Sequence, residues 1–118
     1  MENLTIETFK TKIFDFENNQ EWKYNGHLPS ILVFSALGWC IPCQKLHPVL
    51  EDLSKEYEGK MNIYEIDVEE QQELSTIFNV KSVPTLLFIP LNEYPKVLVG
   101  GIGKEKFKSL ISDVLKVQ

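Results

Sequence analysis

The chain has 118 residues, 43% of them apolar, which suits one globular domain whose core needs no disulfide to stay folded. Twelve basic residues against seventeen acidic ones give a net charge of −5, and no run of Lys or Arg could track a phosphate backbone, so nucleic acid is not an expected partner. No stretch approaches the ~18 apolar residues of a membrane helix, and the N-terminus lacks a secretory pattern. We expect a soluble protein, cytoplasmic by preference, or periplasmic or secreted if a leader has been removed.

The first expected elements are a short helix, a loop and a strand. Thr5 can cap a helix whose apolar residues follow at helical spacing. Residues 17–30 are rich in turn formers and predict a loop, with a short extended piece at residues 22–24. The continuous apolar run at residues 31–34 is typical of a central strand that is covered on both faces.

The remaining elements alternate between helices and strands. A clear amphipathic helix follows the cysteines; its apolar residues are Leu46, Val49, Leu50, Leu53 and Tyr57. Strands are predicted at residues 62–68, 85–89 and 96–100, with a short helix over residues 69–78 between the first two. That short helix is expected to bury Leu74, Ile77 and Phe78, and the chain closes with another helix.

This order of elements predicts an α/β fold in three layers, a central mixed β-sheet flanked by helices. The last two strands form a hairpin and supply the antiparallel part. We find no linker or internal repeat, so residues 1–118 are expected to form a single domain.

The stretch "GWCIPC" holds both cysteines, two residues apart, at the start of the amphipathic helix. Cys40 would lie at the helix N-terminus, where unpaired N–H groups and the helix dipole favour its thiolate. Pro42 fits the first turn, where its missing N–H is not needed. Cys43 lies nearly one turn on, close enough to attack a mixed disulfide on Cys40. The spacing therefore predicts a redox couple.

A structural bridge and a metal site are two other uses of such a pair, and the sequence favours neither. A structural bridge over two residues would constrain little of the unfolded chain. A zinc site could use Cys40, Cys43 and His47, but zinc takes four ligands and the only other histidine, His27, lies in a distant loop. We therefore expect no metal and no cofactor. His47 either tunes Cys43, four residues away on the helix, or is a surface residue.

The chain resembles the thioredoxin family over nearly its whole length. "ILVFSALGWCIPCQKLHPVLEDLSKEY" resembles the family's strand, active-site loop and kinked helix, "SVPT" its cis-proline loop, and "VGGIGKEKF" its last strand and the turn into the final helix. The match is to a small bacterial-type thioredoxin with a CIPC active site. It implies the thioredoxin fold and a disulfide reductase that serves electron transport and cell redox homeostasis.

The resemblance also assigns roles. Cys40 would be the nucleophile, Cys43 the resolving cysteine and Pro84 the cis proline that faces them, exposing the backbone of Val83 to an extended substrate. The substrate-binding rim would comprise Trp39, Ile41, Pro42, Val83, Pro84, Gly100 and Gly101, with Ile102 beside them.

Three positions depart from the family pattern. Ile41 replaces a glycine between the cysteines, Phe34 stands where the family has a buried Asp, and Ile63 stands where we place its partner Lys. Since that carboxylate helps to deprotonate the second cysteine, Cys43 would need another proton acceptor; water, Ser35 and Glu65 are the candidates.

The predicted function is reduction of protein disulfides through a Cys40/Cys43 couple with a potential near ~−270 mV. The predicted partners are disulfide-containing proteins and an upstream reductase, with neither nucleic acid nor a membrane, and the chain is expected to be a monomer. Two alternatives remain open: an oxidase or isomerase of secreted proteins, and a redox-inert interaction module.

Overall fold

Five strands form one mixed sheet in the order β1-β3-β2-β4-β5, in a computed structural model that describes residues 1–118. The strands are β1 (Glu2–Asn3), β2 (Ser30–Ser35), β3 (Asn62–Asp67), β4 (Thr85–Ile89) and β5 (Lys96–Val99). β3 pairs in parallel with both β1 and β2, whereas β4 runs antiparallel to β2 and to β5. The predicted mixed sheet is confirmed, and its antiparallel part begins at β4.

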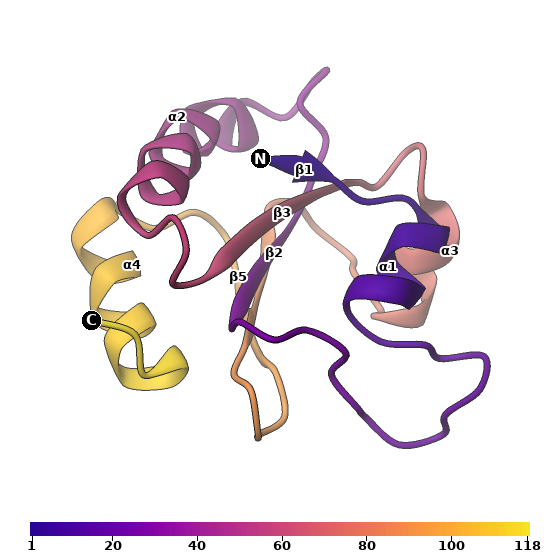
Figure 1. Cartoon of the computed structure of the whole chain (residues 1–118). Helices are drawn as coiled ribbons and strands as arrows, with labels where there is room; N and C mark the ends of the chain where they lie inside the picture. The colour runs from indigo at the N-terminus through magenta and orange to yellow at the C-terminus, as the bar shows by residue number, and fades with distance from the viewer.

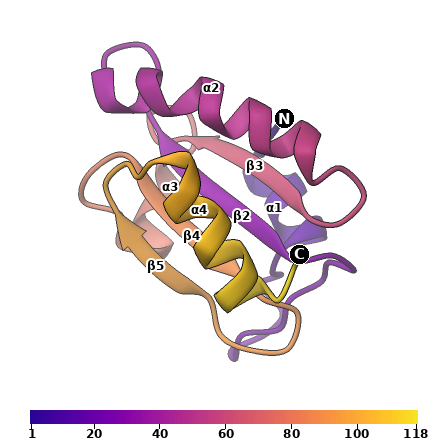
Figure 2. The same cartoon turned by 90° about the vertical axis from the view of Figure 1, so that its left-hand side faces the viewer.

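Helices cover both faces of this sheet (Figures 1 and 2). They are α1 (Ile6–Lys12), α2 (Ile41–Glu56), α3 (Gln72–Ile77) and α4 (Lys104–Leu110), which continues as a π-helical segment, Ile111–Leu115. α2 and α4 lie on one face, and α1 and α3 on the other (Figure 1). The three-layer architecture is thus confirmed. No helix combines the length and apolar character needed to span a bilayer.

Each face of the sheet carries its own core. Ile31 and Val33 point into a cluster shared with α2 and α4, which includes Phe107, while Leu32 and Phe34 point into a second cluster with α1 and α3. All four of these β2 side chains are essentially inaccessible to water. Successive residues of a strand face opposite sides, so an unbroken apolar run is what a strand between two helical layers requires.

The structure confirms some of the local predictions made from the sequence and contradicts others. Thr5 caps α1 as predicted: its Oγ1 accepts from the Thr8 N–H at 3.3 Å, and the Thr8 hydroxyl accepts from the Thr5 N–H at 2.8 Å. Residues 17–30 form the predicted loop up to the start of β2; residues 22–24 within it belong to no strand, and the Tyr24 hydroxyl donates to the carbonyl of Leu28. The predicted burial of Ile77 is wrong, since it lies on the outer side of α3 and is 41% exposed.

Candidate active site

Cys40 and Cys43 lie where β2 passes into α2. Cys40 is the N-cap of α2, and the two sulfurs are joined in a disulfide with the Cα atoms 5.2 Å apart. The Cys43 backbone N–H donates to Cys40 Sγ at 3.2 Å. Pro42 occupies the first turn, where no N–H is required. An N–H aimed at the sulfur, together with the dipole of a 16-residue helix, stabilises negative charge on Cys40 once the disulfide opens.

The two cysteines are enclosed by the loop before β4. Cys40 and Cys43 form a small buried cluster with Ala36, against which Val68 and Val83 pack. Cys40 Sγ lies 3.7 Å from the carbonyl oxygen of Val83. A disulfide sulfur carries no proton, so this approach is a contact in the oxidised protein; a thiol or a substrate N–H could donate to the same oxygen.

The Val83–Pro84 peptide bond is cis, as the family resemblance implied. Its loop is tied to the sheet on both sides: the Gly100 N–H donates to the carbonyl of Pro84 at 2.8 Å, and the Thr85 hydroxyl donates to the carbonyl of Ser82 at 2.7 Å. Gly100 has a φ of 99°, a left-handed conformation that glycine adopts without strain. β5 therefore holds the loop against the cysteines.

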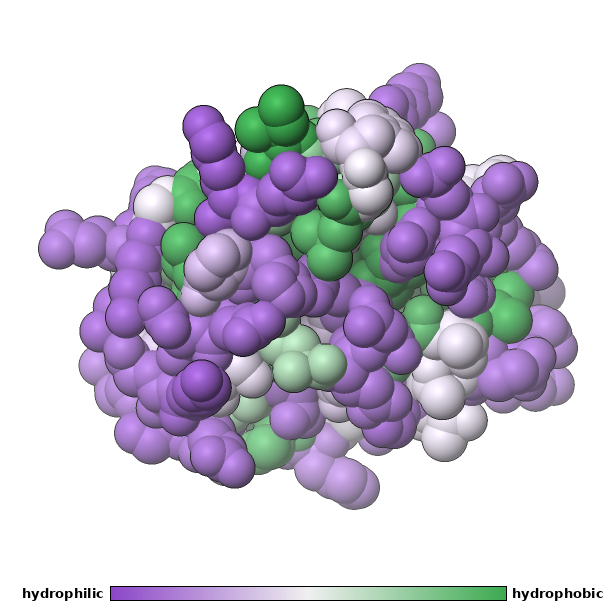
Figure 3. Space-filling view, turned by 90° about the horizontal axis from the view of Figure 1, so that it is seen from above, coloured by the Kyte–Doolittle hydropathy of each residue, from purple (hydrophilic) through white to green (hydrophobic).

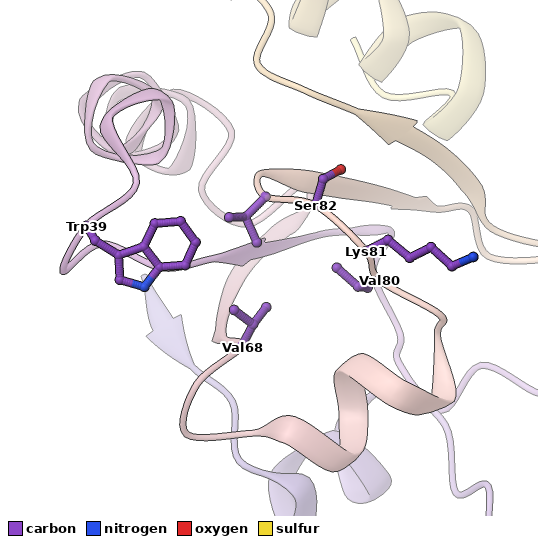
Figure 4. A pocket seen from close by; sticks show the side chains of 6 residues that line it. Trp39, Val68, Val80, Lys81 and Ser82 are labelled. Carbon is purple, nitrogen blue, oxygen red and sulfur yellow. The ribbon is translucent and has the colours of Figure 1, made fainter.

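An apolar rim surrounds this pair. Trp39 and Ile41 are each 61% exposed although they flank a buried cysteine. The Trp39 indole N–H donates to Glu69 Oε1 at 2.6 Å, which fixes the ring over a hollow of about 380 Å³ between the active-site loop and the segment before Pro84 (Figure 4). Seen from the end of the molecule that carries this loop, apolar side chains gather within a mostly polar surface (Figure 3).

The predicted rim residues divide between two sides of the pair. Trp39 and Val83 line the hollow just described, with Val68, Val80, Lys81 and Ser82. Pro42 and Gly101 instead line a second hollow with Leu46, Val49 and Ile102. Gly100 and Pro84 line neither hollow and are joined by the backbone hydrogen bond described above. The sequence analysis missed Val68, Glu69 and Lys81; the parallel pairing of β2 and β3, which brings the two strand ends together, is the signal that would have placed the first two.

Glu65, Phe34 and Ile63 are the positions linked to proton transfer from Cys43, and they do not all face the same helices. Glu65, in β3, is only 3% exposed, and its Oε1 lies 2.9 Å from His47 Nδ1. Phe34 packs on the opposite face, its ring centroid 5.8 Å from that of Phe78. Ile63 belongs to the α2 side and pairs in register with Ile31, not with Phe34. The sequence analysis placed the family's buried Asp and its partner Lys at positions 34 and 63. This placement of a contacting pair is wrong for this chain, because the side chains of Phe34 and Ile63 face opposite helical layers.

Comparison with known proteins gives a consistent result. The family model described as "Thioredoxin" matches residues 5–113. The chain is similar to a thioredoxin of Borreliella burgdorferi, with 42% identity over 94% of each chain, and to thioredoxin C-2 of Corynebacterium nephridii, with 33% identity over 92% of this chain and 91% of the relative. The crystal structure of chloroplastic thioredoxin z superposes with a TM-score of 0.78 at 23% identity, covering 95% of this chain and 91% of the other, a likeness of fold.

Proposed function

The chain belongs to the thioredoxin family and is a thiol-disulfide oxidoreductase that reduces protein disulfides, and we propose that Cys40 is its nucleophile and Cys43 its resolving cysteine. The observation that carries this assignment is the asymmetry of the pair at the helix N-terminus. The Cys40 sulfur receives the N–H of Cys43, whereas Cys43 lies inside the first turn and its sulfur accepts no N–H; the two residues are almost equally buried, at 4% and 2% exposed. Thiolates are stabilised at such N-termini, and the thiolate is the attacking species.

The reaction has two exchange steps. The Cys40 thiolate attacks one sulfur of a substrate disulfide, forming a bond between Cys40 and the substrate and releasing the other substrate sulfur as a thiolate. Cys43 then loses its proton and attacks Cys40 Sγ, forming the Cys40–Cys43 bond and releasing the second substrate thiolate. Two electrons pass to the substrate, and an upstream reductase returns them by reducing the pair.

The substrate segment would lie in extended form beside Val83. The Val83 N–H has no hydrogen-bond partner within the chain, and its carbonyl oxygen faces Cys40 Sγ at 3.7 Å. A backbone segment pairing with these two groups would bring its own sulfur to Cys40. Trp39, Ile41 and the hollow next to them would receive the neighbouring apolar side chains, and Pro42, Pro84, Gly100 and Gly101 would complete the surface.

We further propose that the chain acts as a single domain and a monomer in the cytoplasm. A compartment that keeps thiols reduced supplies the electrons that a disulfide reductase consumes. The family match over residues 5–113 supports one functional unit.

Single-cysteine variants test these roles in an insulin-reduction assay. Cys40→Ser should be inactive, whereas Cys43→Ser should accumulate a mixed disulfide on Cys40 that mass spectrometry detects. Trapping on Cys43 in the Cys40→Ser variant would reverse the assignment. Titration of the couple in glutathione buffers separates the alternatives, because a midpoint above about −200 mV belongs to an oxidase or isomerase. A folded wild-type protein that reduces nothing would indicate an interaction module.

A further inference from the structure

The turn that carries Trp39 is held by few of its own contacts. It comprises residues Leu37–Trp39, connects β2 to α2 and stands out from that end of the molecule (Figures 1 and 2). Leu37 is 36% exposed and Trp39 is 61% exposed, and neither packs into a hydrophobic cluster. The N–H groups of Trp39 and Cys40 both donate to the Ala36 carbonyl, at 3.2 and 2.8 Å. Apolar packing therefore does not fix the position of this turn.

Two side chains from outside the turn form hydrogen bonds with it. Gln44 Nε2 donates to the carbonyl oxygen of Leu37 at 2.7 Å, and Glu69 Oε1 accepts the indole N–H of Trp39 at 2.6 Å. The two partners come from different elements, since Gln44 belongs to α2 and Glu69 follows β3. The turn is thus connected to the rest of the protein at its first residue by Gln44 and at its last by Glu69.

Gln44 is a rigid point from which to hold the turn. Its backbone N–H donates to the carbonyl of Cys40 at 3.0 Å, and it directly follows Cys43 in α2. The helix is anchored in the core by buried residues that include Leu46 and Leu50. The bond to Leu37 has the length of a well-formed N–H···O hydrogen bond. An anchored helix therefore fixes an exposed turn through one amide group.

The bond acts on geometry more than on stability. It is exposed to solvent, so water would satisfy the Leu37 carbonyl if the amide were removed. Water would not, however, hold that carbonyl at a fixed distance from α2. The loss of the Gln44 amide should therefore increase the motion of the turn, and with it the motion of Trp39, while the fold is retained.

Resting on the proposed role of Trp39 in substrate binding, we propose that Gln44 is a positioning residue. Its hydrogen bond to Leu37 keeps the turn against α2, so that the Trp39 indole and the hollow beside it are arranged before a substrate arrives. Ordering an exposed segment during binding lowers affinity, and an arranged rim avoids that cost. The bond is the same before and during the sulfur exchange, so it contributes to KM and not to kcat.

Gln44→Met tests the role, because it removes the donor but keeps an uncharged side chain of similar length and helix propensity. We expect its KM for insulin to rise about twofold to tenfold, the equivalent of one net hydrogen bond, with kcat unchanged. The chain has two tryptophans, so time-resolved fluorescence anisotropy in a Trp22→Phe background reports Trp39 alone. The fast component of the anisotropy decay should grow when Gln44→Met is added to that background.

Gln20→Met is the matched control. Gln20 is exposed, its side chain forms no hydrogen bond, and it lies in the loop before β2, at the opposite end of that strand from the turn. This variant should change neither KM nor the anisotropy of Trp39. An unchanged KM or an unchanged Trp39 anisotropy in Gln44→Met would overturn the inference.

A small disulfide separates this inference from the proposed function. Reduced wild-type protein should react with 5,5′-dithiobis(2-nitrobenzoate) at Cys40, and Gln44→Met should react at the same rate, because the reagent does not need the rim that binds a protein. A wild-type protein whose Cys40 does not react would contradict the proposed role of Cys40. A slower reaction in Gln44→Met would mean that Gln44 acts on the nucleophile itself, which would overturn its assignment as a residue that positions the turn.

Discussion

Phe34 is an apolar residue at the position where the sequence comparison with the family pattern predicts a buried Asp. It is fully buried between the sheet and α3, in contact with a cluster that includes Phe9 and Phe78. We predict that Phe34→Asp lowers the free energy of unfolding by at least about 3–5 kcal/mol, the range for removing a buried Phe, because a carboxylate would also be buried there. Urea denaturation measures this change.

A milder substitution provides the control for Phe34. Phe34→Leu keeps an apolar side chain and buries no charge, so it should cost clearly less than Phe34→Asp, although it leaves part of the ring's volume empty. A stable Phe34→Asp protein that resolves its mixed disulfide faster than wild type would show that the carboxylate reaches Cys43 after all, contrary to its place on the α1 and α3 face.

Glu69 contacts the exposed side chain of Trp39, in contrast to the buried Phe34. It accepts the Trp39 indole N–H at 2.6 Å and thereby holds a side chain that would otherwise rotate in water. We predict that Glu69→Ala changes stability by less than about 0.5 kcal/mol. Its kcat/KM with a protein disulfide should fall roughly fivefold, the equivalent of one net hydrogen bond of about 1 kcal/mol.

Glu70→Ala is the matched control for Glu69, since its exposed side chain makes no hydrogen bond. Equal kcat/KM values for the two variants would mean that the orientation of Trp39 does not contribute to substrate binding.

At the scale of elements, α2 and α4 are joined by ion pairs at the edge of their shared core. Glu56 of α2 lies 2.6 Å from Lys108 Nζ and 3.4 Å from Lys104 Nζ. The hydrogen bond from Lys108, and then the charges of both lysines, hold the pKa of Glu56 below its ordinary value of 4.5. The folded protein therefore keeps this carboxylate ionised at pH values where the unfolded chain binds a proton.

The sign of this shift fixes the pH window. The contribution of Glu56 is fully present above its unfolded-state pKa and is lost as the pH falls through its lower folded-state pKa. We predict that Glu56→Gln lowers the thermal midpoint at pH 7 and that the difference from wild type disappears in acid. Glu58→Gln, which removes a carboxylate outside the ion pairs, is the control; an equal loss at pH 7 would attribute the effect to net charge alone.

Features that depend on neighbouring residues could be predicted from the sequence, whereas features that depend on tertiary contacts could not. The cap at Thr5 and the apolar stripe of α2 depend on neighbouring residues, so the pattern alone located them. β1 was missed, because its two polar, exposed residues form a strand only through register with β3. Likewise the cysteine motif predicts its own chemistry, whereas the contact between His47 and Glu65 exists only once α2 lies on β3.

Considering the whole molecule, the reactive cysteine pair lies outside the two hydrophobic cores that stabilise the fold. The Cα radius of gyration is 13.3 Å, close to the ~13.5 Å of a compact chain of this length. Two core clusters, of 14 and 9 buried residues, lie on either side of the sheet, and neither contains a cysteine. The cysteines form a third, three-residue cluster at one end, so the couple can open and close on a scaffold that stays folded.

This separation predicts that the fold survives loss of the disulfide. A bridge that closes a loop of four residues restricts the unfolded chain by only about 2 kcal/mol at 25 °C, against total stabilities of about 5–15 kcal/mol. We therefore expect the oxidised protein, the dithiothreitol-reduced protein and a Cys40→Ala/Cys43→Ala variant all to unfold cooperatively in urea, monitored by circular dichroism. The reduced form should be less stable than the oxidised one by no more than about 2 kcal/mol, and the variant by about a further 1 kcal/mol for the atoms removed from a buried site. A variant that is already unfolded in water would mean that the bridge is structural and that the two cores alone do not specify this fold.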